Sequence, residues 1–362
     1  MRILIAAGGS GGHIFPALAL AEEISKRNDI EILFVASRRQ LDRSILKKVK
    51  CRKFYLSINP MPYRVGLKIV PFAVKLIYDL AASFIILLIT RPRVVVGFGG
   101  YTAGSVVLLA KLMGAGTLIH EQNLVPGRAN KYIDRIVDKV AISFRESKDY
   151  FRNKNVVFTG NPLRKSLTLE AGKNIHDIFG FKQGLFTLLV MGGSQGARSL
   201  NRLAIAAIQK IDPEIRNHMQ VIHLTGRADY DYINNFYKEG RVRSKVFSFI
   251  DNVHYAYITS DIAISRSGAS AIYELALYGK PMILVPYPYS KNNQRFNAEY
   301  FAQKGAAVYK EESELDAKGL ALIIEGLIKD KAALNNLSMK AKGLSFPESS
   351  RALSEEVMKC VK

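Results

Sequence analysis

The 362-residue sequence contains only two cysteines, Cys51 and Cys360, and they lie far apart in the chain. Small secreted proteins commonly depend on several disulfides, whereas cytosolic proteins keep their thiols reduced. Two isolated cysteines exclude a disulfide framework and predict a protein of the reducing cytoplasm.

Acidic residues are also scarce, since 31 Asp and Glu stand against 52 Lys and Arg, for a net charge of +21. Such a surplus favours anionic partners, such as phosphorylated substrates or an anionic membrane surface. The sequence has no recognisable nucleic-acid-binding motif, so we expect no nucleic-acid partner. Its apolar content of 48% is that of an ordinary globular protein.

Long apolar runs are missing as well. The longest clean run, Ala81 to Ile89, is too short to cross a bilayer, which needs about 20 apolar residues. It ends the apolar segment 65–89, whose basic neighbours are Arg64, Lys68, Lys75, Arg91 and Arg93. We expect part of this segment to be a core helix. The expected membrane surface comprises the rest, with Leu67 and Phe72, and the preceding residues Met61 and Tyr63. The apolar start of the chain, 3–7, is too short for a signal peptide and predicts a first strand.

The length predicts two domains, and the order of apolar runs predicts their class. Strands are expected at 2–7, 31–36, 94–97, 117–120, 138–142, 187–191, 219–224, 245–249, 261–265, 281–285 and 306–309. Helical patterns alternate with them, which predicts an α/β fold with parallel sheets covered on both faces. The segment 160–162 resembles a hinge. We therefore expect an N-terminal domain at 1–160, a C-terminal domain at 161–345 and a terminal helix at 346–362.

Glycine-rich loops follow three of these strands, at 8–12, 97–104 and 192–196. Dense glycine indicates a backbone that a ligand approaches closely, although tight helix–sheet packing is the alternative. The first loop lacks the third glycine of the dinucleotide motif G-x-G-x-x-G. The second strand ends in Ser37-Arg38-Arg39 rather than in an acidic residue that could hold the ribose of NAD. The two arginines could suit NADP, but they are weak evidence for such a site. The strand, loop and helix at 2–27 are echoed 184 residues later (Gly8 to Gly192).

Two polar clusters lie where strands are expected to end, 120–123 and the start of a helix predicted at 269–278. Ligands collect at the carboxyl edge of an α/β sheet, and a helix N-terminus there binds phosphate. Glu274, one turn inside the helix, could accept two ribose hydroxyls, although a solvated glutamate is the alternative. The segment 229–231 matches the short metal-binding pattern D-x-D, but acidic residues also suit the start of a surface helix.

Together the motifs resemble the MurG family of peptidoglycan N-acetylglucosaminyltransferases, in order from residue 2 to about 310. The matching stretches are 8–17 (GGSGGHIFPA), 97–101 (GFGGY), 120–123 (HEQN), 160–164 (GNPLR), 192–198 (GGSQGAR), 265–269 (SRSGA) with Glu274, and Gln294 with 297–298 (NA). Ser10 stands where the family commonly carries Thr, which keeps a small hydroxyl.

The resemblance implies the GT-B fold: two Rossmann-like domains whose parallel sheets face a cleft, and a C-terminal helix that returns to the first domain. It implies an inverting transfer of GlcNAc from UDP-GlcNAc to the 4-hydroxyl of MurNAc in lipid I. The product would be lipid II for peptidoglycan synthesis, and hence for cell shape and division. No cofactor and no metal are implied. The expected partners are UDP-GlcNAc, undecaprenyl-linked lipid I, the anionic cytoplasmic face of the cell (inner) membrane, where the protein would be peripheral, and other cell-wall synthesis proteins.

The resemblance also implies roles for individual residues. In the donor site, Glu274 would hold the ribose, the backbone at Ile250 the uracil, and Ser194 a phosphate. Charge stabilisation would come from Arg164, Ala269 and Ser270, sugar contacts from Asn293 and Gln294, and further donor contacts from Ser10, Gly11, Gly12 and Asn123. The first two glycine loops would cradle the acceptor's diphosphate. His13, at a loop and suited to pH 7, would be the general base, with Glu121 as its rival.

Three other functions remain open. A transferase acting on another lipid, such as diacylglycerol, would share the fold and donor motifs but less readily the stretches 120–123 and 192–196. A UDP-sugar epimerase uses the same architecture without a lipid. A nucleotide-sugar-binding or dinucleotide-binding module would bind its ligand without turnover.

Overall fold

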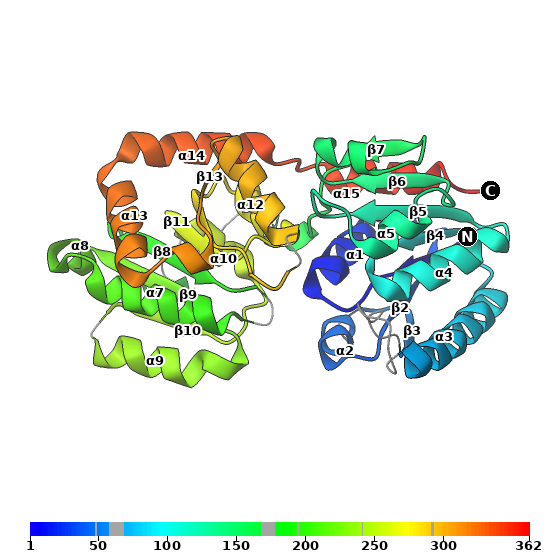
Figure 1. The fold of residues 1–362 in the computed structure, drawn as a ribbon, viewed down its shortest axis with the longest axis horizontal. Helices are drawn as coiled ribbons and strands as arrows, with labels where there is room; N and C mark the ends of the chain where they lie inside the picture. Colours follow the sequence, from blue (N-terminus) through cyan, green and yellow to red (C-terminus); the bar gives the residue numbers. More distant parts are fainter. Residues whose placement is uncertain (48, 58–68, 168–177, 194–195, 241, 291–292) are drawn as a thin grey trace. The chain divides into compact units, whose positions relative to one another are not determined.

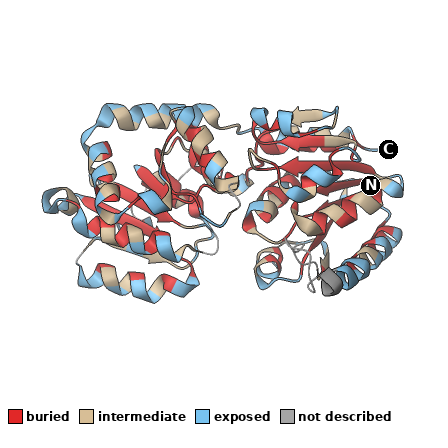
Figure 2. Ribbon diagram, in the orientation of Figure 1, coloured by how far each residue is buried: buried red, intermediate tan, exposed pale blue. Residues whose placement is uncertain are grey.

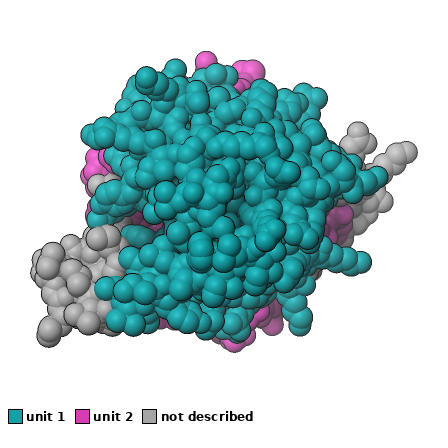
Figure 3. All heavy atoms as spheres, turned by 90° about the vertical axis from the view of Figure 1, so that its right-hand side faces the viewer, with its two compact units in different colours: residues 1–165, 347–362 teal, residues 166–346 magenta. Residues whose placement is uncertain are grey.

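The computed structural model describes residues 1–47, 49–57, 69–167, 178–193, 196–240, 242–290 and 293–362. The chain forms two compact units (Figure 3). Unit 1 comprises Met1–Lys165 and Pro347–Lys362, and unit 2 comprises Ser166–Phe346. The domain boundaries expected after residues 160 and 345 stay a prediction.

Unit 1 is built on a seven-stranded sheet in the order β3-β2-β1-β4-β5-β6-β7, in which every pairing is parallel (Figure 1). Its strands are β1 (Arg2–Ala6), β2 (Glu31–Ser37), β3 (Arg52–Leu56), β4 (Val94–Gly97), β5 (Gly116–Glu121), β6 (Lys139–Ile142) and β7 (Val156–Phe158). Its helices are α1 (Gly11–Ile24), α2 (Gln40–Leu46), α3 (Ile69–Thr90), α4 (Gly100–Leu112), α5 (Arg128–Ile133) and α15 (Ser349–Met358), with a 3-10 turn η1 (Arg145–Tyr150).

The central strands of unit 1, such as β1, β4 and β5, are buried on both faces (Figure 2). Side chains of a strand alternate between the faces of its sheet, so β1 contributes to two cores. Ile3 and Ile5 pack in one core with α1 and α15, and Leu4 and Ala6 pack in the other with α3 and α4. The terminal helix α15 therefore completes one face of unit 1.

Unit 2 repeats this plan with six parallel strands in the order β10-β9-β8-β11-β12-β13. Its strands are β8 (Phe186–Met191), β9 (Met219–Leu224), β10 (Ser244–Phe247), β11 (Ile262–Ser265), β12 (Met282–Leu284) and β13 (Ala307–Tyr309). Its helices are α7 (Arg198–Lys210), α8 (Pro213–Asn217), α9 (Tyr230–Glu239), α10 (Val253–Thr259), α11 (Ala269–Leu277), α12 (Asn293–Gln303), α13 (Ala317–Lys329) and α14 (Lys331–Leu344). Short 3-10 turns are η2 (Lys165–Leu167), η3 (Arg227–Asp229) and η4 (Glu312–Glu314).

The strand orders explain why the glycine loops occur where they do. In unit 1 the strand order reverses between β1 and β4, and in unit 2 between β8 and β11. A doubly wound sheet binds its ligands beyond the carboxyl ends of the strands at such a reversal. All three glycine loops and the stretch 265–269 follow these four strands, so each unit has one candidate ligand edge.

Some expectations were wrong in detail. Helix α1 begins at Gly11, not at Ile14, because the last two glycines of the first loop already form its first turn, so Pro16 lies inside the helix. Strands β3 and β7 were not predicted. Both are edge strands. β3 begins with Arg52-Lys53, which interrupts the apolar pattern by which a strand is recognised, and β7 is only three residues long.

Helix α3 also differs from expectation. The window Ala73–Thr90 has a mean hydropathy of 2.0 and is long and apolar enough to cross a membrane. The prediction that no stretch of the chain could do so is wrong, because single polar residues such as Asp79 and Ser83 hardly lower the mean. Met61, Tyr63 and Leu67 of the expected membrane face lie outside the described residues, as does the side chain of Phe72.

Candidate functional site

The first glycine loop of unit 1 is held from behind by a buried aspartate. Gly9 has φ +89°, which favours glycine, and its N–H donates to Asp42 Oδ2 over 2.8 Å. Ser37 donates to the same oxygen over 2.5 Å. Asp42 is fully buried, so it fixes the loop without occupying its outer side.

His13 sits in the first turn of α1 with one ring nitrogen committed to the loop. Its Nδ1 lies 3.1 Å from the carbonyl oxygen of Gly8 and 3.3 Å from Ser10 Oγ. A carbonyl only accepts, so Nδ1 carries the proton and Nε2 carries the lone pair. Among the described residues nothing donates to Nε2, so this nitrogen is open to a ligand.

The second glycine loop makes room for this imidazole. Gly99 has φ +85° and Gly100 has φ +76°. A Cβ on Gly99 would lie 3.3 Å from His13 Nε2, and one on Gly100 would lie 3.1 Å from the carbonyl oxygen of Gly8. The two glycine loops of unit 1 therefore meet at His13.

Glu121, which the sequence analysis gave as the rival base, is a buried carboxylate that accepts hydrogen bonds from the loop around it. It is 2% exposed, and four N–H groups donate to its carboxylate. Oε1 accepts from the backbone and side-chain nitrogens of Asn123 over 3.0 and 3.1 Å, and Oε2 accepts from Gly127 N over 3.0 Å and Asn130 Nδ2 over 2.8 Å. The buried carboxylate therefore orders the loop that follows β5.

His120 is also structural. Its Nε2 donates to the carbonyl oxygen of Gly160 over 3.0 Å, and Nδ1 accepts from Gln122 Nε2 over 3.0 Å. Complete burial lowers the pKa of His120 from 6.5 to about 4, so the ring stays neutral. It anchors β5 to the segment 160–164.

That segment carries Arg164, which belongs to unit 1. Its guanidinium lies 4.5 Å from the ring centroid of Phe15 in α1, a cation–π contact. Ser350 of α15 accepts from Leu163 N over 3.1 Å and donates to its carbonyl over 2.8 Å. Arg164 is thus a positioned positive charge.

In unit 2, the edge at α11 combines a helix start with a carboxylate. The N-cap is Gly268, which has no side chain to accept from the first-turn N–H groups, and Ala269 and Ser270 follow it. Glu274 is 7% exposed, and Tyr257 of α10 donates to its Oε2 over 2.7 Å. The alternative of a solvated glutamate is therefore wrong, because α10 covers one side of the Glu274 carboxylate.

Gln294 and Asn293 open α12 beside this edge. The side-chain oxygen of Gln294 accepts from Tyr287 N over 3.0 Å, and its carbonyl accepts from Ser267 Oγ over 2.7 Å. The amide oxygen therefore fixes the backbone at Tyr287, and the amide N–H groups of Gln294 could serve a sugar hydroxyl.

The remaining donor expectations are placed only in part. Ser194 lies outside the described residues, within the third glycine loop. In that loop Gly196 has φ +76°, and a Cβ there would lie 2.3 Å from the carbonyl oxygen of Thr225, so only glycine fits. Ile250 is partly buried and follows β10.

Both halves of the chain match domain models of glycosyltransferase family 28, the N-terminal domain at residues 3–142 and the C-terminal domain at 187–353. A relative from Desulforamulus reducens is named UDP-N-acetylglucosamine–N-acetylmuramyl-(pentapeptide) pyrophosphoryl-undecaprenol N-acetylglucosamine transferase. It is 34% identical over 370 residues, which cover 100% of this chain and 98% of the relative. The chain belongs to the MurG family.

Solved structures agree on the fold. MurG from Acinetobacter baumannii superimposes with a TM-score of 0.78 over 99% of each chain, at 24% sequence identity. A UDP-GlcNAc 2-epimerase from Neisseria meningitidis, bound to UDP-GlcNAc, gives a TM-score of 0.72 at 15% identity and covers 99% of this chain and 100% of its own. At these identities both show the GT-B fold alone.

Three supporting residues of this MurG-family chain escaped the sequence analysis. They are Asp42 behind the first loop, Asn130 against Glu121, and Arg266, which bonds to three separated segments of unit 2. Asp42 and Asn130 carry no motif, and only a paired substitution across relatives would have pointed to them. Arg266 lies inside a matched motif, but its partners are distant in sequence.

The D-x-D pattern is structural in this chain. Asp229 is 5% exposed and accepts from Arg198 Nε over 3.1 Å and from Asn201 Nδ2 over 2.9 Å. Within the described parts of the chain, no group of three or more His, Cys, Asp or Glu is arranged to hold a metal ion. Asp229 instead links the start of α7 to η3.

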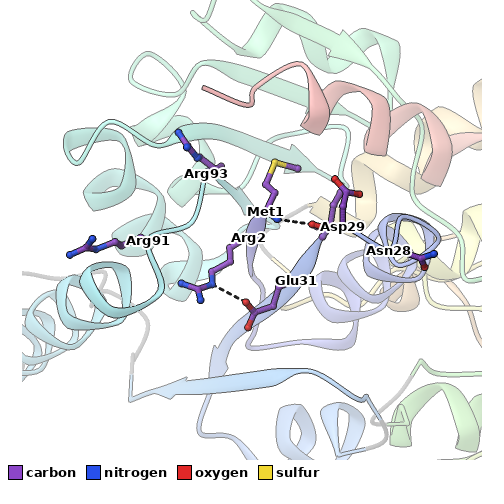
Figure 4. Close-up of a pocket in the computed structure, with 8 residues that line it drawn as sticks. Met1, Arg2, Asn28, Asp29, Glu31, Arg91 and Arg93 are labelled. Atoms are coloured by element: carbon purple, nitrogen blue, oxygen red, sulfur yellow. Dashed lines mark hydrogen bonds and ion pairs between the residues drawn. The ribbon is translucent and has the colours of Figure 1, made fainter.

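A shallow cavity of about 550 Å³ lies at the opposite, amino edge of the unit 1 sheet (Figure 4). Arg2, Arg91 and Arg93 line this cavity. Arg2 is paired with Glu31 over 2.8 Å, and the side chains of Arg91 and Arg93 point away from this pair. Since the cationic groups do not converge, the cavity lacks the geometry of an anion site.

Proposed function

We propose that this chain transfers GlcNAc from UDP-GlcNAc to the MurNAc 4-hydroxyl of lipid I and thereby makes lipid II. The observation that carries the proposal is full-length membership of the MurG family, with both glycosyltransferase domains in order. The chain is accordingly a glycosyltransferase, and the substrate assignment follows the name of its relatives.

In this proposal unit 2 binds the donor. The Glu274 carboxylate, oriented by Tyr257, accepts the two ribose hydroxyls, and the start of α11 binds phosphate through its N–H groups. As UDP departs with the electron pair of the broken bond, these N–H groups stabilise its growing negative charge. Uracil at the Ile250 backbone, and sugar hydroxyls at Asn293 and Gln294, complete the donor contacts.

Unit 1 binds the acceptor. The glycine loops, including Ser10, Gly11 and Gly12, accommodate its diphosphate. The acceptor 4-hydroxyl attacks the anomeric carbon, and His13 Nε2 takes its proton. The side chain of Asn123 donates a hydrogen bond to the Glu121 carboxylate, which fixes its position. Arg164, packed on Phe15, supplies a fixed positive charge. A single direct displacement at an α-linked donor inverts the linkage to β.

We also propose that the protein is peripheral on the cytoplasmic face of the inner membrane, attached through α3. This helix buries Ile86 and Leu87 in the core, but it exposes more large apolar side chains than it buries, unlike a normal surface helix. Asp79, Ser83 and Thr90 are buried, and Asp79 accepts from Ser57 N over 3.0 Å. Leu76 is among the exposed apolar side chains of α3, and seven others form what we call the apolar stripe: Val74, Ile77, Tyr78, Phe84, Ile85, Leu88 and Ile89.

The apolar stripe follows one face of the helix, which is largely coloured as exposed in Figure 2. Lys75 on α3 and Arg91 just beyond its end supply positive charge. Each basic residue near an anionic leaflet contributes about 1 kcal/mol, and salt weakens the attraction. A surface position suits a helix whose other face packs on β3 and α4. Interaction with other cell-wall synthesis proteins stays a prediction.

The decisive experiment measures UDP release from UDP-GlcNAc with and without lipid I. Release that requires lipid I supports the proposal. UDP release or sugar isomerisation without any lipid would indicate an epimerase, the alternative supported only by fold. Release with diacylglycerol but not with lipid I would indicate another lipid transferase, and binding without turnover would indicate a binding module.

The membrane proposal has its own test. Ile77→Asp, at a 67% exposed position of the apolar stripe, should reduce binding to anionic vesicles and turnover of lipid I. Turnover of a short-chain, water-soluble acceptor should stay near wild type. Leu322→Asp, at a 58% exposed position of α13 in unit 2, is the matched control and should change neither. If both turnovers of Ile77→Asp fall together, the apolar stripe is part of the fold rather than a membrane face.

A further inference from the structure

Unit 2 contains an arginine that is almost completely buried. Arg266 directly follows β11, and only 4% of its surface is exposed. Removing a guanidinium from water is costly unless hydrogen bonds and an opposite charge compensate. The hydrogen-bond and ion-pair partners of Arg266 therefore show which parts of unit 2 the buried guanidinium holds together.

The partners come from separate parts of the chain. NH1 donates to the carbonyl oxygens of Val285 over 3.1 Å and Pro286 over 2.9 Å, and NH2 donates to Ser199 Oγ over 2.9 Å. Glu312 Oε2 lies 2.5 Å from NH1 and supplies the opposite charge. The planar guanidinium thus bonds to the segment after β12, the first turn of α7 and η4 at once.

Two of these segments, the start of α7 and the segment after β12, adjoin the proposed donor edge. Ser199 lies in the turn that follows the third glycine loop. The carbonyls of Val285 and Pro286 begin the segment that ends at Gln294, and the Tyr287 ring centroid lies 5.6 Å from the Arg266 guanidinium. The next residue, Ser267, donates to the Gln294 carbonyl and precedes the N-cap of α11.

We infer that Arg266 is a positioning residue for donor binding. It holds the start of α7, the entry to α11 and the segment 285–287 in the arrangement that receives the nucleotide sugar. This rests on the proposed function, in which unit 2 binds UDP-GlcNAc. Because Arg266 is buried and its NH1 and NH2 groups bond to these segments, it acts through them rather than by touching the ligand.

The test uses Arg266→Lys in the full-length protein. Lysine keeps the charge but has no planar fork with which to reach three segments. UDP affinity, measured by calorimetry well below the unfolding temperature, should fall by about tenfold, the effect of losing one hydrogen bond to a charged group. The KM for UDP-GlcNAc should rise in parallel, while the KM for the lipid acceptor stays unchanged. Millimolar guanidinium added to Arg266→Ala should restore part of the UDP affinity.

Arg295→Lys is the matched control. Arg295 lies on α12 in the same unit, is 52% exposed, and pairs with Glu299 over 2.7 Å, so its replacement should leave UDP affinity unchanged. If Arg266→Lys binds UDP as wild type does, or only lowers the unfolding temperature, the inference is overturned while the proposed function stands. If wild type fails to bind UDP, the proposed function itself fails.

A milder variant covers the case in which Arg266→Lys does not fold. Ser199→Ala removes a single partner of the guanidinium, and UDP binding should weaken by about threefold. Unchanged affinity in Ser199→Ala would then overturn the inference.

Discussion

Among the charged side chains buried beneath the two candidate ligand edges, Glu121 in unit 1 and Arg266 in unit 2 have differently distributed partners. Glu121 in unit 1 accepts from Asn123, Gly127 and Asn130, all within nine residues of itself. Arg266 in unit 2 donates to Ser199, which is 67 residues away, and to carbonyls about twenty residues away.

The difference separates two ways of building a site. The carboxylate organises one loop whose ends are close in sequence, so closing that loop costs little entropy. The guanidinium joins elements that meet only after the sheet has formed. We therefore expect damage at Glu121 to stay local and damage at Arg266 to spread over several segments.

The largest expected effect is that of Glu121→Ala on the stability of unit 1. The substitution leaves four donors without their charged acceptor, and each such bond contributes about 1.5–3 kcal/mol, so we expect a loss of at least about 3 kcal/mol. Native-state hydrogen exchange at residues 121–133 measures it. Glu121→Gln, which keeps two acceptor sites, should lose less.

If Glu121→Ala instead retains its exchange protection but loses turnover, Glu121 contributes to the chemistry and the comparison with Arg266 fails. Residues 262–290 of unit 2 are the internal control, since their protection should not change.

The next effect is kinetic. His13→Ala should lower kcat by about a hundredfold or more, the scale of general base catalysis, while UDP affinity stays unchanged. Ser10→Ala, which removes only the hydroxyl 3.3 Å from His13 Nδ1, should lower it far less. A decrease below tenfold for His13→Ala at saturating acceptor would assign the proton to another group, or show that the chemical step is not rate-limiting.

These residues also show how far the sequence could predict the site. His13 and Glu274 were recognisable because they follow glycine loops and strands at the correct edge. Glu121 was recognisable as a site residue but not as a structural one, because the amide that occupies it, Asn130, lies in a helix without any motif. The partners of Arg266 were beyond prediction, because they meet only through the strand order of unit 2.

The same limit applies to the fold. Strands buried on both faces, such as β1 and β8, are continuous apolar runs and were predicted. The edge strand β3 contains Arg52 and Lys53 and is partly exposed, so tertiary pairing with β2 rather than its own pattern determines it.

A smaller effect concerns UDP binding. Glu274→Gln keeps an acceptor for Tyr257 but removes the charge, so UDP affinity should fall by about tenfold, as expected for a lost hydrogen bond to a carboxylate. Tyr257→Phe, the matched control, leaves the charge and removes only its orientation, so it should have a weaker effect. Equal calorimetric affinities for Glu274→Gln and wild type would exclude Glu274 from the ribose site. The α11 edge of unit 2 would then lack the ligand contact on which the comparison of the two units depends.

The smallest expected effect is the change of stability with each pH unit. A buried histidine in each unit allows the two units to be compared. Burial lowers the pKa of His120 to about 4 and that of His223 to about 3, from 6.5 in the unfolded chain. Below pH 6.5 the unfolded state binds protons that the native state does not, so stability falls as pH falls, by at most about 1.4 kcal/mol per pH unit for each histidine.

Between pH 6.5 and 5 both units should therefore weaken together, as measured by urea unfolding at intervals of half a pH unit. His223 is held by Tyr237, whose hydroxyl lies 3.0 Å from Nδ1, and by Asn201 Oδ1, 3.2 Å from Nε2. Replacing it in His223→Asn should reduce the pH slope of unit 2 alone and leave that of unit 1 unchanged, whatever the loss of stability at pH 7. An undiminished slope in unit 2 would mean that His223 is not the group that titrates on unfolding.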